Sequence, residues 1–147
     1  MRSPQWAFFS RFDILDERTG ELYLRRWRIV QTPWFGIYLH KIATPDKDRD
    51  LHDHPWPFLS IVLRGGYDER IGVDTTEAAI AERPPHTVMV RRRWLSAAFR
   101  RSTDAHRITR LHRTPTWTLV LVGPRRRSWG FYTADGYVDW KTYLGVQ

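Results

Sequence analysis

The sequence has no cysteine, and this absence removes several classes of site. Disulfide scaffolds, thiol nucleophiles, thiolate zinc sites and iron–sulfur clusters all need cysteine sulfur, so histidine and carboxylate remain as the strong metal ligands. Long apolar runs are also missing. No segment approaches the roughly 18 residues of a membrane helix, and the N-terminus lacks the apolar stretch of a signal peptide. We therefore expect a soluble, cytoplasmic protein.

Lysine is scarce, although the chain is strongly basic. Only three of its 24 basic residues are lysine, and the formal net charge is +8. A basic chain suggests nucleic-acid binding, but that function needs the positive charge gathered on one surface. Here the arginines are dispersed along the chain, so a basic nucleic-acid-binding domain is a disfavoured alternative. The runs are Arg25-Arg26-Arg28, Arg91-Arg92-Arg93, Arg100-Arg101 and Arg125-Arg126-Arg127.

Helical periodicity is hard to find, and this points to an all-β fold. The 147 residues suit one domain spanning 1–147, and eight Trp, seven Phe and six Tyr can fill its core. Turn signals recur at short spacing between stretches rich in aromatic and branched residues, as in a β-sandwich or barrel. Residues 75–82 could form a short helix or a loop. The expected strands are 12–15, 22–30, 35–42, 58–63, 67–71, 87–90, 106–111, 116–122, 128–132 and 137–140.

Two glycine-containing turns define expected hairpins. Gly20 lies between the first two strands, in the sequence Arg18-Thr19-Gly20-Glu21. A second turn, Gly65-Gly66, ends the strand 58–63, and we expect 67–71 to return as its hairpin partner.

Two of the six histidines stand two positions apart, in Leu51-His52-Asp53-His54-Pro55-Trp56. In extended backbone this spacing sends both imidazoles to one side, while Asp53 points away. Two neutral nitrogen ligands on one face suit a first-row transition metal. Asp50 shares their parity and is a possible additional ligand or orienting group.

The surroundings of this pair resemble the first motif of the cupin superfamily. That motif runs Gly, five residues, His-x-His, three or four residues, Glu, six residues, Gly. His52 and His54 match its histidines and Gly65 its closing glycine. Asp46 replaces the opening glycine, and Phe58 stands where the glutamate should be.

The family's second motif supplies one more histidine from a later strand. His106 is the best match, 52 residues beyond His54. The Pro-x-Gly that precedes this histidine is absent, and Arg110 occupies the usual asparagine position. His112 therefore remains an alternative ligand.

The resemblance implies a small antiparallel jelly-roll barrel with the site at its mouth. The segment His52-Asp53-His54-Pro55-Trp56, taken with the later segments around Ala105-His106-Arg107 and 118–125, is similar to a group of bacterial and phage cupin-like proteins. The implied metal ligands are His52, His54 and His106, and the implied cofactor is a divalent Fe, Zn, Ni or Mn ion.

With Phe58 in place of the glutamate, the implied site keeps three neutral imidazoles and the full charge of the ion. Such a site favours a small anionic molecule, and with iron it is similar to the thiol dioxygenase branch of cupins. Oxygenase, hydrolase and isomerase chemistry all stay open, and no catalytic residue is assigned. Possible substrate-binding groups near the motif are Arg64, Tyr67 and Trp56.

Two further interpretations need no metal chemistry. Cupin-fold epimerases use a histidine base, and His54 with Asp50 or Asp53 would supply one. A non-catalytic cupin that binds a small ligand is the other. A homodimer is possible, and Trp6, Phe8 and Phe9 could then cover an exposed sheet edge.

Overall fold

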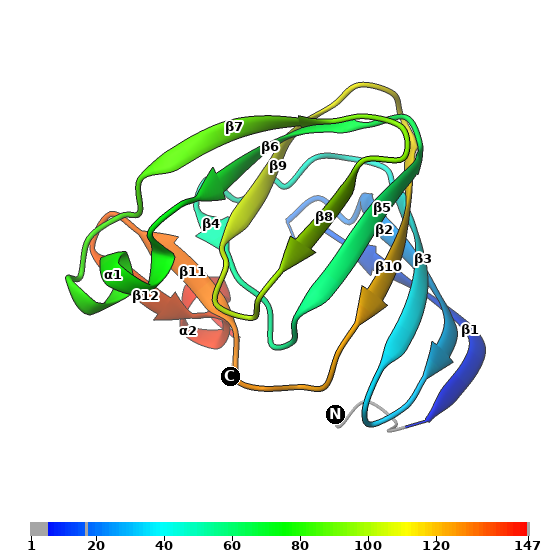
Figure 1. The fold of residues 1–147 in the computed structure, drawn as a ribbon, viewed down its shortest axis with the longest axis horizontal. Helices are drawn as coiled ribbons and strands as arrows, with labels where there is room; N and C mark the ends of the chain where they lie inside the picture. The colour runs from blue at the N-terminus through cyan, green and yellow to red at the C-terminus, as the bar shows by residue number, and fades with distance from the viewer. Residues whose placement is uncertain (1–5, 17, 147) are drawn as a thin grey trace.

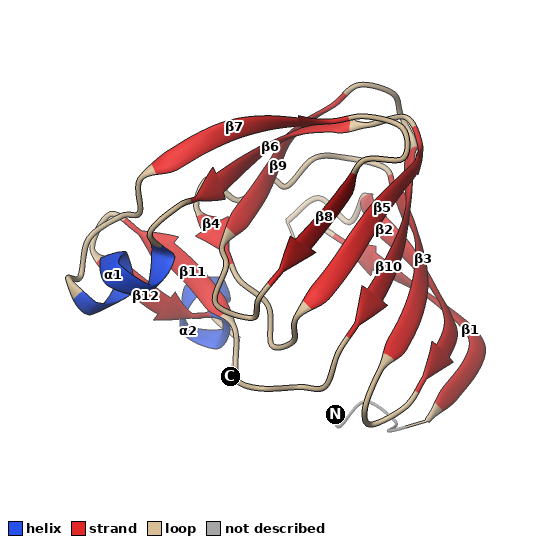
Figure 2. Ribbon diagram, viewed as in Figure 1, coloured by secondary structure: helices blue, strands red, loops and turns tan. Residues whose placement is uncertain are grey.

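The computed structural model describes residues 6–16 and 18–146, which form two antiparallel β-sheets facing each other (Figures 1 and 2). The first sheet has the strand order β1-β2-β3-β10-β5-β8, and the second has the order β12-β11-β4-β9-β6-β7. Strands of the first sheet are β1 (Ala7–Leu15), β2 (Leu22–Gln31), β3 (Gly36–Ile42), β5 (Phe58–Arg64), β8 (Ala97–Arg100) and β10 (Thr116–Val122). Those of the second are β4 (Leu51–His52), β6 (Tyr67–Gly72), β7 (Thr87–Arg92), β9 (His106–Leu111), β11 (Gly130–Thr133) and β12 (Gly136–Asp139).

Strict alternation of side chains makes the inner wall of the first sheet. In β3 and β10 every second residue is buried, as the period of two requires when one face is covered by another sheet. The central strand β10 pairs with β3 on one side and β5 on the other. These strands carry the aromatic and hydroxyl side chains that face the interior.

The apolar core joins the two sheets at one end of the barrel. Leu24, Ile42 and Val62 from the first sheet pack with Tyr67 and Ile108 from the second. A second cluster, centred on Phe58 and Val120, belongs to the first sheet. Side chains of both clusters also line an internal cavity, and this is where the candidate site lies.

Two short helices flank the second sheet beside β11 and β12 (Figures 1 and 2). They are α1 (Thr75–Ile80) and α2 (Trp140–Leu144). The Asp139 side chain accepts a hydrogen bond from the Lys141 N–H and so caps α2. The expectation of an all-β fold is confirmed. Of the two alternatives for residues 75–82, a short helix or a loop, the structure has the helix. No helix among the described residues is long and apolar enough to span a membrane.

One predicted hairpin is confirmed and the other is wrong. β1 and β2 pair antiparallel across the turn that contains Gly20. β5 and β6, however, do not pair, because they belong to different sheets. Gly65 and Gly66 both have positive φ, +85° and +145°, and the backbone at these residues carries the chain across to the second sheet.

The aromatic residues near the N-terminus lie along an edge of the first sheet. Phe8 and Phe9 are part of β1, which is itself the edge strand, and Trp6 directly precedes it. All three side chains remain exposed.

Candidate metal centre

The extended backbone at residues 51–54 turns His52 and His54 toward the interior and Asp53 away from it. Asp53 is fully buried on the opposite side, where its carboxylate accepts hydrogen bonds from the Gly130 N–H (2.8 Å) and the Tyr132 hydroxyl (3.1 Å). It also pairs with the guanidinium of Arg127. Asp53 therefore anchors this segment, and its anchoring fixes the direction of the two imidazoles.

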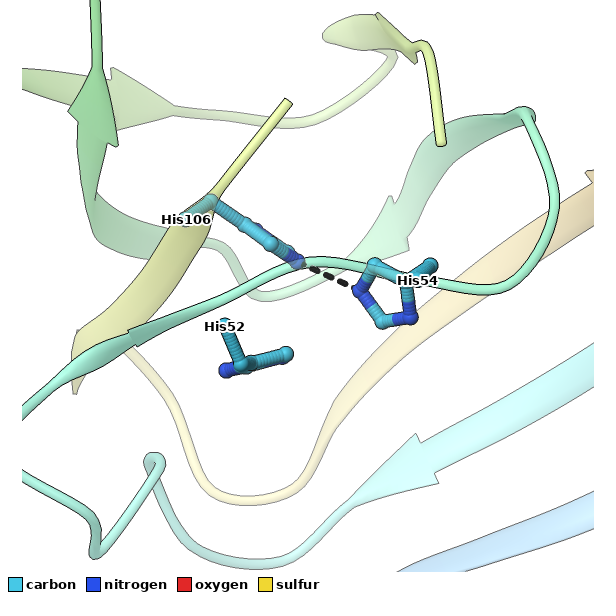
Figure 3. Close-up of side chains that lie close together, drawn as sticks. All are labelled: His52, His54 and His106. Atoms are coloured by element: carbon cyan, nitrogen blue, oxygen red, sulfur yellow. Dashed lines mark hydrogen bonds between the residues drawn. The ribbon is translucent and has the colours of Figure 1, made fainter. Parts of the chain in front are cut away.

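His106 reaches the same point from another strand. It is the first residue of β9 and lies directly opposite His52 in the pairing of β4 with β9. The Nε2 atoms of His54 and His106 lie 2.9 Å apart, as the dashed line in Figure 3 marks. One nitrogen from each of the three histidines lies within 4.8 Å of the others. The structure thus brings together imidazoles from two distant segments.

Three imidazole donors, together with one of their spacings, suit a divalent transition ion. Two nitrogens bound to one ion at about 2.1 Å would be about 3.0–3.4 Å apart for angles between octahedral and tetrahedral, and the observed 2.9 Å is close to that range. Burial is the main influence on the pKa of His52, lowering it from 6.5 to about 4. Burial, with the neighbouring imidazoles, also holds the pKa of His54 well below its usual value. Both rings are therefore neutral near pH 7, as metal ligation requires.

Glu69 orients His106, and the sequence analysis missed it. It lies on β6, is 1% exposed, and its carboxylate is 2.6 Å from His106 Nδ1. That contact directs the Nε2 atom of His106 to the interior. Arg92 donates a 2.9 Å hydrogen bond to the same carboxylate, and the Arg100 guanidinium lies 2.9 Å away without a well-aligned hydrogen bond. Burial opposes the ionisation of Glu69, but His106 and the two arginines outweigh it and hold its pKa at about 2.

Phe58 closes one side of the three histidines. Its ring centre lies 4.8 Å from that of His54 and 5.8 Å from that of His106. The position that would carry a glutamate in the cupin motif is thus occupied by an apolar ring in contact with the imidazoles. Phe58 therefore adds no ligand to the candidate centre, whose donors are the three imidazoles.

The three histidines face a cavity of about 800 Å³. Two residues expected to contact a ligand, Trp56 and Tyr67, line this cavity. The hydroxyl of Tyr67 is buried, and burial raises its pKa to about 12. Arg64 is absent from the lining, because it is exposed at the far end of β5.

Asp50 and His112 do not join the three histidines. Asp50 accepts a 3.0 Å hydrogen bond from the Tyr143 hydroxyl. β9 ends at Leu111, and His112 turns outward to place its Nε2 2.7 Å from a carboxylate oxygen of Asp68. His112 would share the inward parity of His106 only if β9 continued, and the strand stops one residue before it.

The last two histidines have other partners. His40 is buried in the first sheet, and its Nε2 accepts a hydrogen bond from Arg26. His86 is exposed beside Asp74. Neither Asp50 nor Asp53 orients His54, because each of those carboxylates accepts hydrogen bonds from other groups.

Comparison with known proteins rests on structure alone. No family model and no curated protein matches the sequence. A cupin-2 domain protein from Rhodospirillum rubrum superposes with a TM-score of 0.59 at 12% identity, covering 92% of this chain and 81% of that one.

Two larger enzymes also superpose. HEPD from Streptomyces albus, solved with its substrate 2-hydroxyethylphosphonate and Fe(II), gives a TM-score of 0.54 at 14% identity. Oxalate decarboxylase from Lactobacillus farciminis, solved with formate, gives 0.51 at 12% identity. The matches cover 94% and 79% of this chain but only 27% and 29% of those proteins. With two facing antiparallel sheets and these structural neighbours, the chain has the cupin fold.

Proposed function

We propose that the chain binds one divalent transition metal ion through His52, His54 and His106 and acts on a small anionic molecule in the barrel. The observation that carries this proposal is the convergence of three imidazole nitrogens within 4.8 Å of one another. Bound there, an ion of this class supplies Lewis-acid activation of a coordinated water or substrate, and iron adds redox chemistry. Fe, Mn, Ni and Zn are all compatible with nitrogen donors.

The surrounding residues support a binding site over a structural cluster of histidines. Glu69 fixes the tautomer and direction of His106, as outer carboxylates do for metal-ligating histidines. Asp53 fixes the segment that carries the other two rings. The rings then open onto a cavity large enough for a small substrate.

Charge supports an anionic substrate. Three neutral imidazoles would leave the full +2 charge of the ion uncompensated, whereas the negative charge of Glu69 is already balanced by Arg92 and Arg100. Two structural neighbours were solved with a phosphonate and a carboxylate, 2-hydroxyethylphosphonate and formate. A hydroxylated or keto acid of similar size is the corresponding substrate class for this chain.

Metal analysis of the purified protein tests the proposal. We expect close to one ion of Fe, Mn, Ni or Zn per chain, lost on His52→Ala and on His106→Ala. His112→Ala is the matched control, because its exposed ring pairs with Asp68, and it should retain the ion. Substoichiometric metal in the wild type after reconstitution, or full metal content in His106→Ala, would overturn the proposal.

One contact favours a second candidate function. A buried carboxylate 2.6 Å from an imidazole, with the other ring nitrogen facing a cavity, is also the arrangement of a general base and its orienting group. A metal-free isomerase would use His106 as base and Glu69 as its partner. Activity that persists after exhaustive chelation, and disappears in His106→Ala but not in His52→Ala, would favour this function.

A further inference from the structure

A second polar group lies on the cavity wall opposite the histidines. Arg26 on β2 pairs in register with His40 on β3, and His40 pairs with Thr118 on β10. All three side chains line the same cavity as the three histidines. Because β2, β3 and β10 belong to the first sheet and His52 and His106 to the second, the two groups come from facing walls (Figure 1).

The guanidinium of Arg26 is held in a fixed orientation. Its Nε donates a 2.8 Å hydrogen bond to the Nε2 of His40. Its central carbon lies 4.9 Å from the ring centre of Tyr38 and 5.3 Å from that of Phe12. One hydrogen bond and two aromatic rings thus position the planar guanidinium, and its terminal nitrogens stay available to a ligand.

His40 accepts this hydrogen bond because it is neutral. Burial, assisted by the positive charge of Arg26, holds the pKa of His40 well below its usual value. A neutral imidazole orients the arginine without cancelling its charge. The contact therefore differs from a salt bridge, which would neutralise the guanidinium.

The charge of Arg26 has no acidic partner among the described residues. Two other arginines line the cavity: Arg18 pairs with Asp48, and Arg125 also lacks an acidic partner in the described part of the chain but is exposed. Asp46 also lines the cavity, but its carboxylate accepts hydrogen bonds from the Tyr23 hydroxyl and the Ile108 N–H. Arg26 is half-buried, and this burial lowers the pKa of its guanidinium. A desolvated charge without a partner is costly unless an anion compensates for it.

We propose that the terminal nitrogens of Arg26 bind the anionic group of the substrate, a carboxylate or a phosphonate, while the other end of the molecule reaches His52, His54 and His106. This inference rests on the proposed metal site for that second end. Arg26 and the three histidines line one cavity of about 800 Å³. A ligand that contacts both is therefore a small molecule, with a hydroxyl or carbonyl at the end opposite the anion. A guanidinium fork matches both anions in a bidentate manner.

Calorimetric titration of the metal-loaded protein with three matched probes tests the inference. The probes are 3-hydroxypropionate, 2-hydroxyethylphosphonate and the neutral 3-hydroxypropionamide. The anion that binds more tightly identifies the preferred anionic group, carboxylate or phosphonate. We expect the neutral amide to bind at least tenfold more weakly than that anion. Arg26→Met should weaken the binding of that anion by about tenfold to hundredfold, the effect of losing a charged hydrogen-bonded pair. The metal content should stay unchanged.

Arg25→Met is the matched control. Arg25 directly precedes Arg26 on the same strand, bonds to Asp13 and is not part of the cavity lining. It should bind the anion within about twofold of the wild type, so general loss of positive charge is separated from loss of the site. Arg26→Lys, which keeps the charge but loses the fork, should weaken binding several-fold and serves if Arg26→Met fails to fold.

The outcomes separate this inference from the proposed function. Wild-type affinity in both Arg26 variants would overturn the inference while leaving the metal site intact. Absence of metal in every preparation, with Arg26-dependent anion binding in the metal-free protein, would overturn the proposed function alone. Failure of both anions to bind the wild type at millimolar concentration would overturn the inference.

Discussion

The Nδ1 atom of His106 lies 2.6 Å from a carboxylate oxygen of Glu69, although the two residues are 37 positions apart in the chain. β6 and β9 are neighbours in the second sheet, and this pairing makes the contact. It assigns Nδ1 to the carboxylate and Nε2 to the cavity. The contact thus connects the topology of the sheet to the direction of one candidate metal ligand.

Glu69→Gln should weaken metal binding by about 10–100-fold, because the orienting charge on His106 is lost. Competition with a chelator of known affinity measures the change. Asp68→Asn is the control on the same strand, since Asp68 contacts the exposed His112 and not the candidate centre. Equal metal affinity in Glu69→Gln and the wild type would show that the carboxylate has no role in ligation.

Phe58→Glu should restore a fourth ligand, because the Phe58 ring already contacts His54 and His106. We expect tighter metal binding but a lower melting temperature in chelator, where a buried carboxylate has no ion to compensate it. The added negative charge should also weaken anion binding. Phe58→Leu, which keeps the position apolar, should leave metal affinity near that of the wild type. If Phe58→Glu binds metal no more tightly than Phe58→Leu, position 58 does not face the ion.

His40 should make the metal-free protein less stable in mild acid. Its pKa is depressed in the folded state, so the unfolded chain binds a proton below about pH 6.5 that the native His40 does not. This contribution to stability is present above that pH and is lost as the pH falls. His40→Gln, which keeps an acceptor for Arg26, should reduce the loss in unfolding free energy between pH 7.5 and pH 5 in urea titrations.

Identical pH dependence in His40→Gln and the wild type would mean that folding does not lower the pKa of His40.

Gly66→Ala should be much more damaging than Gly20→Ala, although both glycines have positive φ. A Cβ at Gly66 would lie 2.5 Å from the carbonyl oxygen of Arg92, whereas one at Gly20 would meet nothing within 4 Å. We expect a loss of about 3 kcal/mol or more at position 66 and about 1 kcal/mol at position 20. Chemical denaturation measures both, and comparable losses would contradict the crossing role assigned to Gly66.

The strands and the His52/His54 pair could be predicted because their signals are local. Alternation and turn residues lie within a few positions of each other, and the spacing of two puts both rings on one face. Pairing across the barrel is not local. Gly65-Gly66 is compatible with a hairpin or a crossing between sheets, and only the packing of the second sheet decides between them.

Glu69 and Arg26 were missed for a related reason. Glu69 shares the inward parity of Tyr67 on β6, which was the available signal, but its partner His106 follows 37 residues later. In the sequence Arg25, Arg26 and Arg28 form one charge run, but alternation sends Arg25 outward to Asp13 and Arg26 inward to the cavity. Charge runs within strands need to be separated by face before they are interpreted.

The most direct test of the candidate metal centre is a crystal structure of the metal-loaded protein with diffraction data collected on both sides of the ion's absorption edge. We expect one anomalous peak bonded to nitrogens of His52, His54 and His106, with Glu69 still bound to His106. A peak elsewhere, or none at these three imidazoles in crystals soaked with excess metal, would contradict a metal centre in this barrel.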